Sequence, residues 1–298
     1  MSSAQSTGRA GLPLVAALLT WFVPGLGLLY LGRALAGLLT FAAIEGLFVA
    51  GALLARGASF DMLDPDLRSS AAFALAPEFG NLGGFLWQFG SYAEPTRALL
   101  PRLFSGPEKL GVLLMAISGL ANLAAISAAH FEARRQEASR RQEIGPGRSP
   151  ALLAALQGLL PGAGYVAQGR RARGLLLGGM LLALYAIGLW LCEAACLERE
   201  RHYYYWSAQL QTGLPALLAS PFAGPLEQAI PRQDLGVFYA GLAGLLNLLT
   251  CLDVYGFQAA RLLGQDPSAA PAPTPAAQAA PAANRKHLVG LPPQGGPA

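Results

Sequence analysis

The stretch Val23-Pro-Gly-Leu-Gly-Leu-Leu-Tyr-Leu-Gly-Arg33 decides the fold, because it returns as Leu160-Pro-Gly-Ala-Gly-Tyr-Val-Ala-Gln-Gly-Arg170. Matched residues lie 137 positions apart: Pro24, Gly25, Gly27, Gly32 and Arg33 in the first copy, and Pro161, Gly162, Gly164, Gly169 and Arg170 in the second. Proline removes a backbone donor from a helix, and glycine accepts backbone angles closed to other residues. Each copy therefore predicts a break or sharp turn in an apolar helix.

A second set of residues repeats with a different offset. Gly111, Gly119 and Asn122 return 125 positions later as Gly236, Gly244 and Asn247. The two offsets indicate that a whole half of the chain was duplicated, with a middle region 12 residues shorter in the second copy. Insertions and deletions collect in loops, so these middle regions are predicted to be the less constrained segments.

The composition indicates a membrane protein. Charged residues make up 13% of the 298 residues and hydrophobic residues 53%, whereas soluble domains carry about 25% charged residues. So few charges could not cover a soluble globule, which excludes a soluble all-helical protein. The formal net charge of +4 is spread over short loops between apolar runs, so no nucleic-acid-binding surface is expected.

The predicted fold is an all-α, polytopic helical membrane protein built from two parallel internal repeats. Its expected parts are a polar start (1–11), the first repeat (12–129), a basic cytoplasmic loop (130–149), the second repeat (150–262) and a disordered Pro/Ala-rich tail (263–298). Apolar runs long enough to cross about 30 Å of hydrocarbon are 34–54, 110–129, 174–197 and 236–254.

Charge distribution favours an even number of crossings in each half. If the Pro-Gly segments enter and leave on one side, Arg9, Arg33, the loop 130–149, Arg170 and Arg261 all face the cytoplasm, as the positive-inside rule requires. This arrangement has four spans and two re-entrant segments, and it requires the breaks to be buried against neighbouring spans. Two alternatives stay open: six spans if the Pro-Gly segments cross, and eight if 73–89 and 205–220 cross as well.

The Pro-Gly-Leu-Gly-Leu-Leu-Tyr-Leu-Gly-Arg run followed by a Gly-Leu-Leu-rich span resembles the two-transmembrane-helix hairpin family, the TM-two domain. Residues 12–54 carry the resemblance best and 151–191 more loosely. It implies a motif turn between two full spans and little chemistry. The Asp-Arg-Phe triplet of many members is replaced by Leu-Leu-Tyr at 28–30 and Tyr-Val-Ala at 165–167. The duplicated form looks like an uncharacterised bacterial membrane-protein family.

Two matched pairs are candidate functional residues. Arg33 and Arg170 follow the motif in both copies and could recognise a lipid phosphate or a partner, or act as anchors that reach the interface. Asn122 and Asn247 lie within apolar spans and need hydrogen-bond partners. They either tie helices together or line a substrate or ion path.

Ionisable groups in or near the spans are further candidates, because their burial in a membrane is costly. They are Glu45, Glu193 and Asp253, and only Glu45 is expected deep in a span. No matched partner for any of them occurs in the other half.

No sequence pattern of catalysis, metal binding or cofactor binding is present, so we expect no enzyme, metal or cofactor. Cys192 and Cys196 are expected on one helix face and Cys251 in a span, so the three cysteines are read as packing residues without a disulfide framework. The aromatic run 203–206 is typical of an interfacial belt.

Two functions remain open. The first is a structural or interaction subunit that contacts the lipid bilayer and a membrane-protein partner or a second copy. The alternative is a small transporter or lipid-handling protein with a cavity between the repeats, lined by Asn122, Asn247 and Glu45. A polar cavity would favour the alternative, and apolar packing between the halves the first. Because arginine far outnumbers lysine, as in GC-rich bacterial genomes, the expected location is a bacterial inner membrane.

Overall fold

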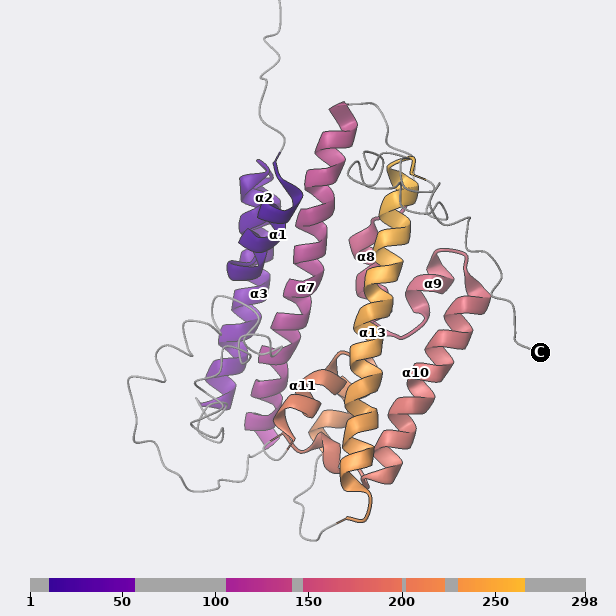
Figure 1. The fold of residues 1–298 in the computed structure, drawn as a ribbon. Helices are drawn as coiled ribbons and strands as arrows, with labels where there is room; N and C mark the ends of the chain where they lie inside the picture. Colours follow the sequence, from indigo (N-terminus) through magenta and orange to yellow (C-terminus); the bar gives the residue numbers. More distant parts are fainter. Residues whose placement is uncertain (1–10, 57–105, 141–146, 200–201, 223–229, 266–298) are drawn as a thin grey trace, which may run out of the picture. The chain divides into compact units, whose positions relative to one another are not determined.

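The computed structural model describes residues 11–56, 106–140, 147–199, 202–222 and 230–265, and these residues form helices and turns without a strand (Figure 1). By its contacts the chain divides into two units, Met1–Gln265 and Asp266–Ala298. Everything described belongs to the first unit. Most of the polar start, the segment 73–89 and the predicted tail after Gln265 lie outside the described residues.

In the part of the chain that the structure describes, four helices are long and apolar enough to cross a membrane, which indicates a membrane protein. They are α3 (Ala34–Ala55), α7 (Gly106–Arg140), α10 (Arg171–Leu191) and α13 (Gln233–Leu262). All four predicted spans are thus confirmed as helices, with shifted ends. Large leucines point outward, such as Leu35 and Leu175, each 73% exposed, as expected of side chains whose solvent is lipid.

The long helices pack in two pairs, α3 with α7 and α10 with α13. Glycines allow the backbones to touch: a Cβ on Gly51 would lie 2.6 Å from the Gly111 carbonyl oxygen, and one on Gly188 would lie 2.8 Å from the carbonyl oxygen of the matched Gly236. Gly51 and Gly188 are 137 positions apart. The same small-residue contact therefore joins both pairs.

Each Pro-Gly motif joins two short helices: α1 (Pro13–Phe22) to α2 (Leu26–Tyr30), and α8 (Pro150–Leu159) to α9 (Ala163–Ala167). With 10 residues each, α1 and α8 are about 15 Å long, too short to cross a bilayer. This corrects the hairpin of two full spans that the family resemblance implied.

The chain returns from each break to the end where it entered (Figure 1). The Leu12 N–H donates to the Tyr30 hydroxyl at 3.4 Å, which joins the start of α1 to the end of α2. In the second copy the Arg148 guanidinium donates to the Ala167 carbonyl at 3.3 Å, which joins the approach to α8 to the end of α9. Both motifs are therefore local excursions.

Helices α7 and α13 run in the same direction where they meet (Figure 1). His130 contacts Tyr255, Phe131 packs in one cluster with Leu262, and Arg134 bonds to Gln265 at 3.4 Å. Residue numbers therefore rise together along both helices. Helices α7 and α13 are therefore parallel over this contact.

The predicted loop 130–149 is wrong over its first part, because α7 continues to Arg140. Residues 130–140 hold strong helix formers and no glycine or proline, so nothing in the sequence stops the helix there. The predicted span 174–197 is too long, because Glu193 and Ala194 adopt left-handed angles (φ 47° and 64°) and end α10.

The described residues between α10 and α13 form only short helices: η3 (Ala195–Leu197), α11 (Tyr203–Leu210), α12 (Leu214–Ala219) and η4 (Ser220–Phe222). None of them can cross a membrane, so the eight-span alternative is wrong for 205–220. The interfacial belt is wrong in part as well: Tyr203 and Trp206 are buried in the core at 3% and 2% exposure, and only Tyr204 and Tyr205 are exposed.

Candidate functional site

The break between α8 and α9 is built on glycine and buried. Gly162 has φ 90°, and a Cβ there would lie 2.3 Å from the Gly174 carbonyl oxygen. In the first copy Gly25 has φ 79°, and a Cβ there would lie 2.1 Å from the Gly37 carbonyl oxygen. Both breaks are buried, which confirms the expectation that neighbouring spans cover them, and Gly178 of α10 packs on the Pro161 carbonyl.

Gln157 satisfies the backbone donors that the second break leaves free. Its Oε1 accepts the N–H groups of Gly162 and Gly164 at 3.1 and 3.2 Å. Its Nε2 donates to Asn247 Oδ1 at 3.1 Å and to Thr250 Oγ1 at 2.8 Å. The side chain is fully buried, and it does what a capping residue does at a helix start.

Asn247 satisfies the acceptors on the other side of the break. Its Nδ2 donates to the carbonyls of Gln157 and Gly158 at the end of α8, at 3.3 and 3.5 Å. It also donates to the Gln211 carbonyl at 2.9 Å. Asn247 is fully buried. Its hydrogen bonds support the interpretation of this residue as a tie between helices.

The first copy uses the same positions with different side chains. Thr20, 137 positions before Gln157, accepts the Gly27 N–H at 3.1 Å. Asn122, 125 positions before Asn247, donates to the Trp21 carbonyl at 3.3 Å. Each break is therefore capped by one polar residue of the short helix and by one asparagine of the long helix.

Helix α11 reaches the tip of α8 from the opposite end of the bundle. A Cβ on Gly213 would lie 2.1 Å from the Gly158 carbonyl oxygen, and one on Gly244 would lie 1.9 Å from the Ala208 carbonyl oxygen. Asn247 holds both segments, since it bonds to the ends of α8 and α11. The segment of α11 and the turn after it thus enters the helical core.

The matched arginines are fixed against the long helices. Arg33 pairs with Glu132 of α7 at 3.2 Å. Arg170 pairs with Asp253 of α13 at 3.4 Å, and its guanidinium lies over the Phe257 ring, 4.3 Å from the centroid. Glu132 and Phe257 are 125 positions apart. Because exposed ion pairs contribute about 0–1 kcal/mol, these contacts orient the Gly-Arg turns more than they stabilise them.

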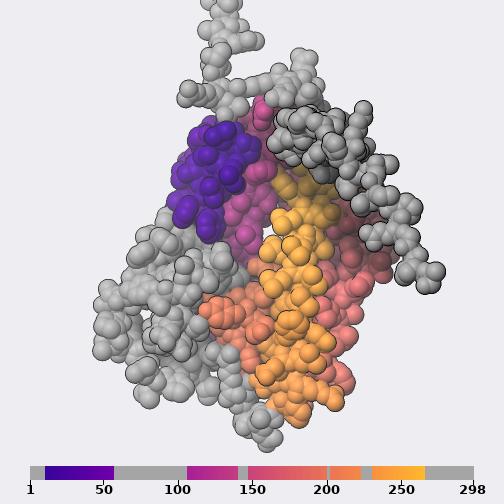
Figure 2. All heavy atoms as spheres, viewed as in Figure 1, coloured from indigo at the N-terminus to yellow at the C-terminus, as the bar shows by residue number. Residues whose placement is uncertain are grey.

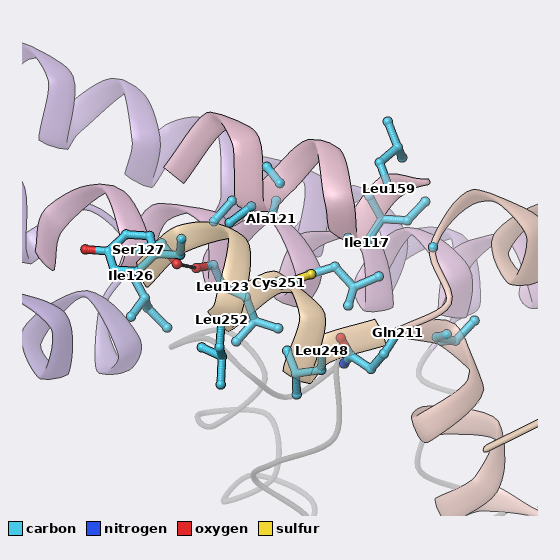
Figure 3. A pocket seen from close by; sticks show the side chains of 18 of the residues that line it. Ile117, Ala121, Leu123, Ile126, Ser127, Leu159, Gln211, Leu248, Cys251 and Leu252 are labelled. Carbon is cyan, nitrogen blue, oxygen red and sulfur yellow. Dashed lines mark hydrogen bonds between the residues drawn. The ribbon is translucent and has the colours of Figure 1, made fainter. Parts of the chain in front are cut away.

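An apolar cavity of about 460 Å³ lies between the two halves, and Figure 2 shows a hollow between α7 and α13. Its walls are formed by α7, α8, α13 and the α11–α12 segment. Figure 3 shows leucine, isoleucine and alanine side chains around it, with the sulfur of Cys251 among them. Polar side chains are few: Ser127, Gln211 and Tyr255, and the Ser127 hydroxyl is already bonded to the Leu123 carbonyl at 3.1 Å.

Matched residues of α7 and α13 line this cavity together. Leu123 and Leu248, Ile126 and Cys251, and Ser127 and Leu252 are pairs 125 positions apart, and all six line the cavity. His130 and Tyr255 form the next such pair, and they contact each other directly through the His130 Nδ1 and the Tyr255 hydroxyl. The His130–Tyr255 contact therefore lies at one end of this row of matched pairs.

The residues expected to line a cavity do not line this one. Asn122 and Asn247 face the breaks, Glu45 is half-buried on α3, and none of the three is among the lining residues. Asp253 pairs with Arg170 and Arg173, and Glu193 is exposed beyond α10. Among the described residues no group of three His, Cys, Asp or Glu side chains could hold a metal ion.

Gln157, Thr20 and the His130–Tyr255 pair were missed as functional positions. One signal in the sequence could have identified Thr20 and Gln157. Both are polar residues in an apolar helix, at matched positions, four residues before the Pro-Gly step. His130 and Tyr255 are matched too, but a loop was expected at 130.

Comparison with known proteins gives a family without an assigned activity. No curated protein and no solved structure matches the chain. One family model matches twice, over residues 15–142 and 152–266. Each match contains one Pro-Gly break and two of the four long helices. The chain therefore belongs to the family of unknown function DUF6677.

Proposed function

We propose that this chain is a bacterial inner-membrane protein in which two parallel repeats hold the hydrocarbon chain of a lipid in the cavity between them. The cavity is apolar and not polar, so the proposal keeps only the lipid-handling part of the alternative and gives it a different set of residues. Binding, without a catalytic step, is the proposed activity. The cavity between α7 and α13 carries the argument.

The chemistry of the cavity suits hydrocarbon. At about 460 Å³ it is within the range of ligand pockets, and its walls are almost entirely apolar. A stable water needs two to four polar partners, and here the Ser127 and Tyr255 hydroxyls already bond within the protein. If α7 and α13 both cross the bilayer, the acyl chains of the surrounding lipids lie next to the cavity, and their chemistry matches its apolar walls.

The parallel arrangement supports the proposed orientation. Arg33, Arg135, Arg170 and Arg173 lie at the end of the bundle to which both Pro-Gly excursions return. Placing that end in the cytoplasm satisfies the positive-inside rule for both halves. The short helices α1 and α8 then form re-entrant segments, whose backbone groups are satisfied by Thr20, Gln157 and the two asparagines.

Photo-crosslinking tests the proposal. The full chain is reconstituted in phosphatidylethanolamine and phosphatidylglycerol vesicles that contain a phospholipid with a diazirine on its acyl chain, and crosslinked peptides are identified by mass spectrometry. We expect crosslinks at 117–127 and 248–255. Ala121→Trp places an indole in the cavity and should reduce them about tenfold, which corresponds to ~1.4 kcal/mol of binding.

The matched control is Ala50→Trp, which adds the same side chain at an exposed position of α3 outside the cavity lining. Its crosslinks at 117–127 should equal those of the unchanged protein. Equal crosslinking in Ala121→Trp and Ala50→Trp would show that the label reports only the lipid-facing surface. The proposal would then be wrong, and a structural or interaction role would be preferred.

A further inference from the structure

The turn after α10 brings two thiols together. Glu193 and Ala194 adopt consecutive left-handed angles, and the chain folds back so that the Cys196 N–H lies 3.4 Å from the Cys192 sulfur. The Cys192 thiol itself donates to the Leu189 carbonyl at 3.8 Å. The expected shared helix face is therefore wrong: Cys192 caps α10 and Cys196 belongs to η3.

The environment favours a nucleophilic Cys192. A hydrogen bond from the Cys196 thiol lowers the pKa of Cys192, and the backbone N–H groups of residues 194–196 act in the same direction, against the effect of burial. The hydrogen bond to Cys192 and burial raise the pKa of Cys196. Successive backbone N–H groups in such a turn form an anion-binding nest, here occupied by the Cys192 sulfur.

We propose that Cys192 and Cys196 form a structural disulfide bond at the extracytoplasmic end of α10. The oxidant is a disulfide, R–S–S–R, of the kind carried by thiol oxidoreductases of the periplasm. The Cys192 thiolate attacks one sulfur, forms a mixed disulfide and releases R–S⁻. The Cys196 thiolate then attacks the Cys192 sulfur and releases the second R–S⁻. The two cysteines are oxidised, and the oxidant is reduced to two thiols, because the two released R–S⁻ groups take up the protons that the cysteines lost.

Position in the fold supports the oxidised state. The pair lies at the end of α10 opposite Arg171, hence opposite the arginine-bearing turns (Figure 1). Both thiols are 0% exposed, in one buried cluster with Trp206, and Gln209 of α11 donates to the Cys196 carbonyl. The disulfide would form before α11 packs over it and would then be protected from reductants. Cys251 lies apart, in the lining of the cavity.

Trapping of thiols in intact cells tests this inference. The full chain is expressed in a bacterial host, cells are quenched in acid, free thiols are blocked with N-ethylmaleimide in SDS, and disulfides are then reduced and labelled with a polyethylene-glycol maleimide. We expect labels on Cys192 and Cys196, seen as a gel shift of the unchanged protein. Cys251→Ser should keep the whole shift, and both Cys192→Ser and Cys196→Ser should abolish it.

Each other result overturns the proposal. If the unchanged protein shows no gel shift, both thiols are reduced in the cell and the disulfide does not form. A shift that Cys251→Ser removes belongs to a different pairing. If either serine variant fails to accumulate, peptide mass spectrometry of the unchanged protein decides, because the 192–196 disulfide lowers the mass of its peptide by two hydrogens relative to the reduced form.

Discussion

Replacing Gln157 with leucine keeps the approximate volume of the side chain and removes its hydrogen bonds. The N–H groups of Gly162 and Gly164 lose their acceptor in a fully buried position. Asn247 Oδ1 keeps a partner, because the Thr250 hydroxyl lies 3.2 Å away. Two orphaned donors at ~1–3 kcal/mol each predict that Gln157→Leu lowers the free energy of unfolding by ~2–6 kcal/mol.

The first repeat supplies an internal comparison. Thr20→Val is nearly isosteric and leaves only the Gly27 N–H without its acceptor. We therefore expect it to lower the free energy of unfolding by ~1–3 kcal/mol, about half the effect of Gln157→Leu. Leu152→Ala, at a 62% exposed position of the same helix as Gln157, serves as the control for substitution in α8. Leu152→Ala should lower the free energy of unfolding much less than Gln157→Leu does.

The measurement is equilibrium unfolding by SDS in mixed micelles, followed by far-ultraviolet circular dichroism. Tryptophan fluorescence, recorded on the same samples, tests whether the transition is two-state. If Gln157→Leu unfolds within ~0.5 kcal/mol of the unchanged protein, a range typical of surface substitutions, the capping argument is refuted. The same holds if Thr20→Val is the more damaging of the two.

Two further predictions concern the breaks and the topology. Gly162→Ala should destabilise more than Gly32→Ala, by ~1–3 kcal/mol in the same unfolding assay: both glycines have positive φ, but only at Gly162 would the new Cβ meet backbone, whereas nothing lies within 4 Å at Gly32. Equal losses would contradict the close approach of the break to α10. In a cysteine-free background, single cysteines that replace Ser139 and Arg171 should be labelled from the cytoplasmic side, and one that replaces Asp234 from the opposite side. If the cysteines at positions 139 and 171 are labelled from opposite sides, re-entrant segments are ruled out.

Local properties made the helices predictable. The spans 34–54 and 236–254 are long and apolar, and the Pro-Gly step must interrupt a helix wherever the chain goes, so sequence alone located both. The ends were less certain. Nothing in the sequence marks the left-handed angles of Glu193 and Ala194, because those angles arise from packing of η3 against α11 and α13 and not from a residue that prefers them.

The sequence by itself determined the duplication, the four apolar helices and the need to bury the breaks, because offsets, hydrophobic length and proline chemistry do not depend on distant contacts. Only the tertiary structure decided which partners those elements meet. It assigned Asn122 and Asn247 to the ends of the short helices, left the cavity to leucines and alanines, and brought His130 to Tyr255. A side chain's partner depends on which helix face lies opposite, and that is set by packing of the whole bundle.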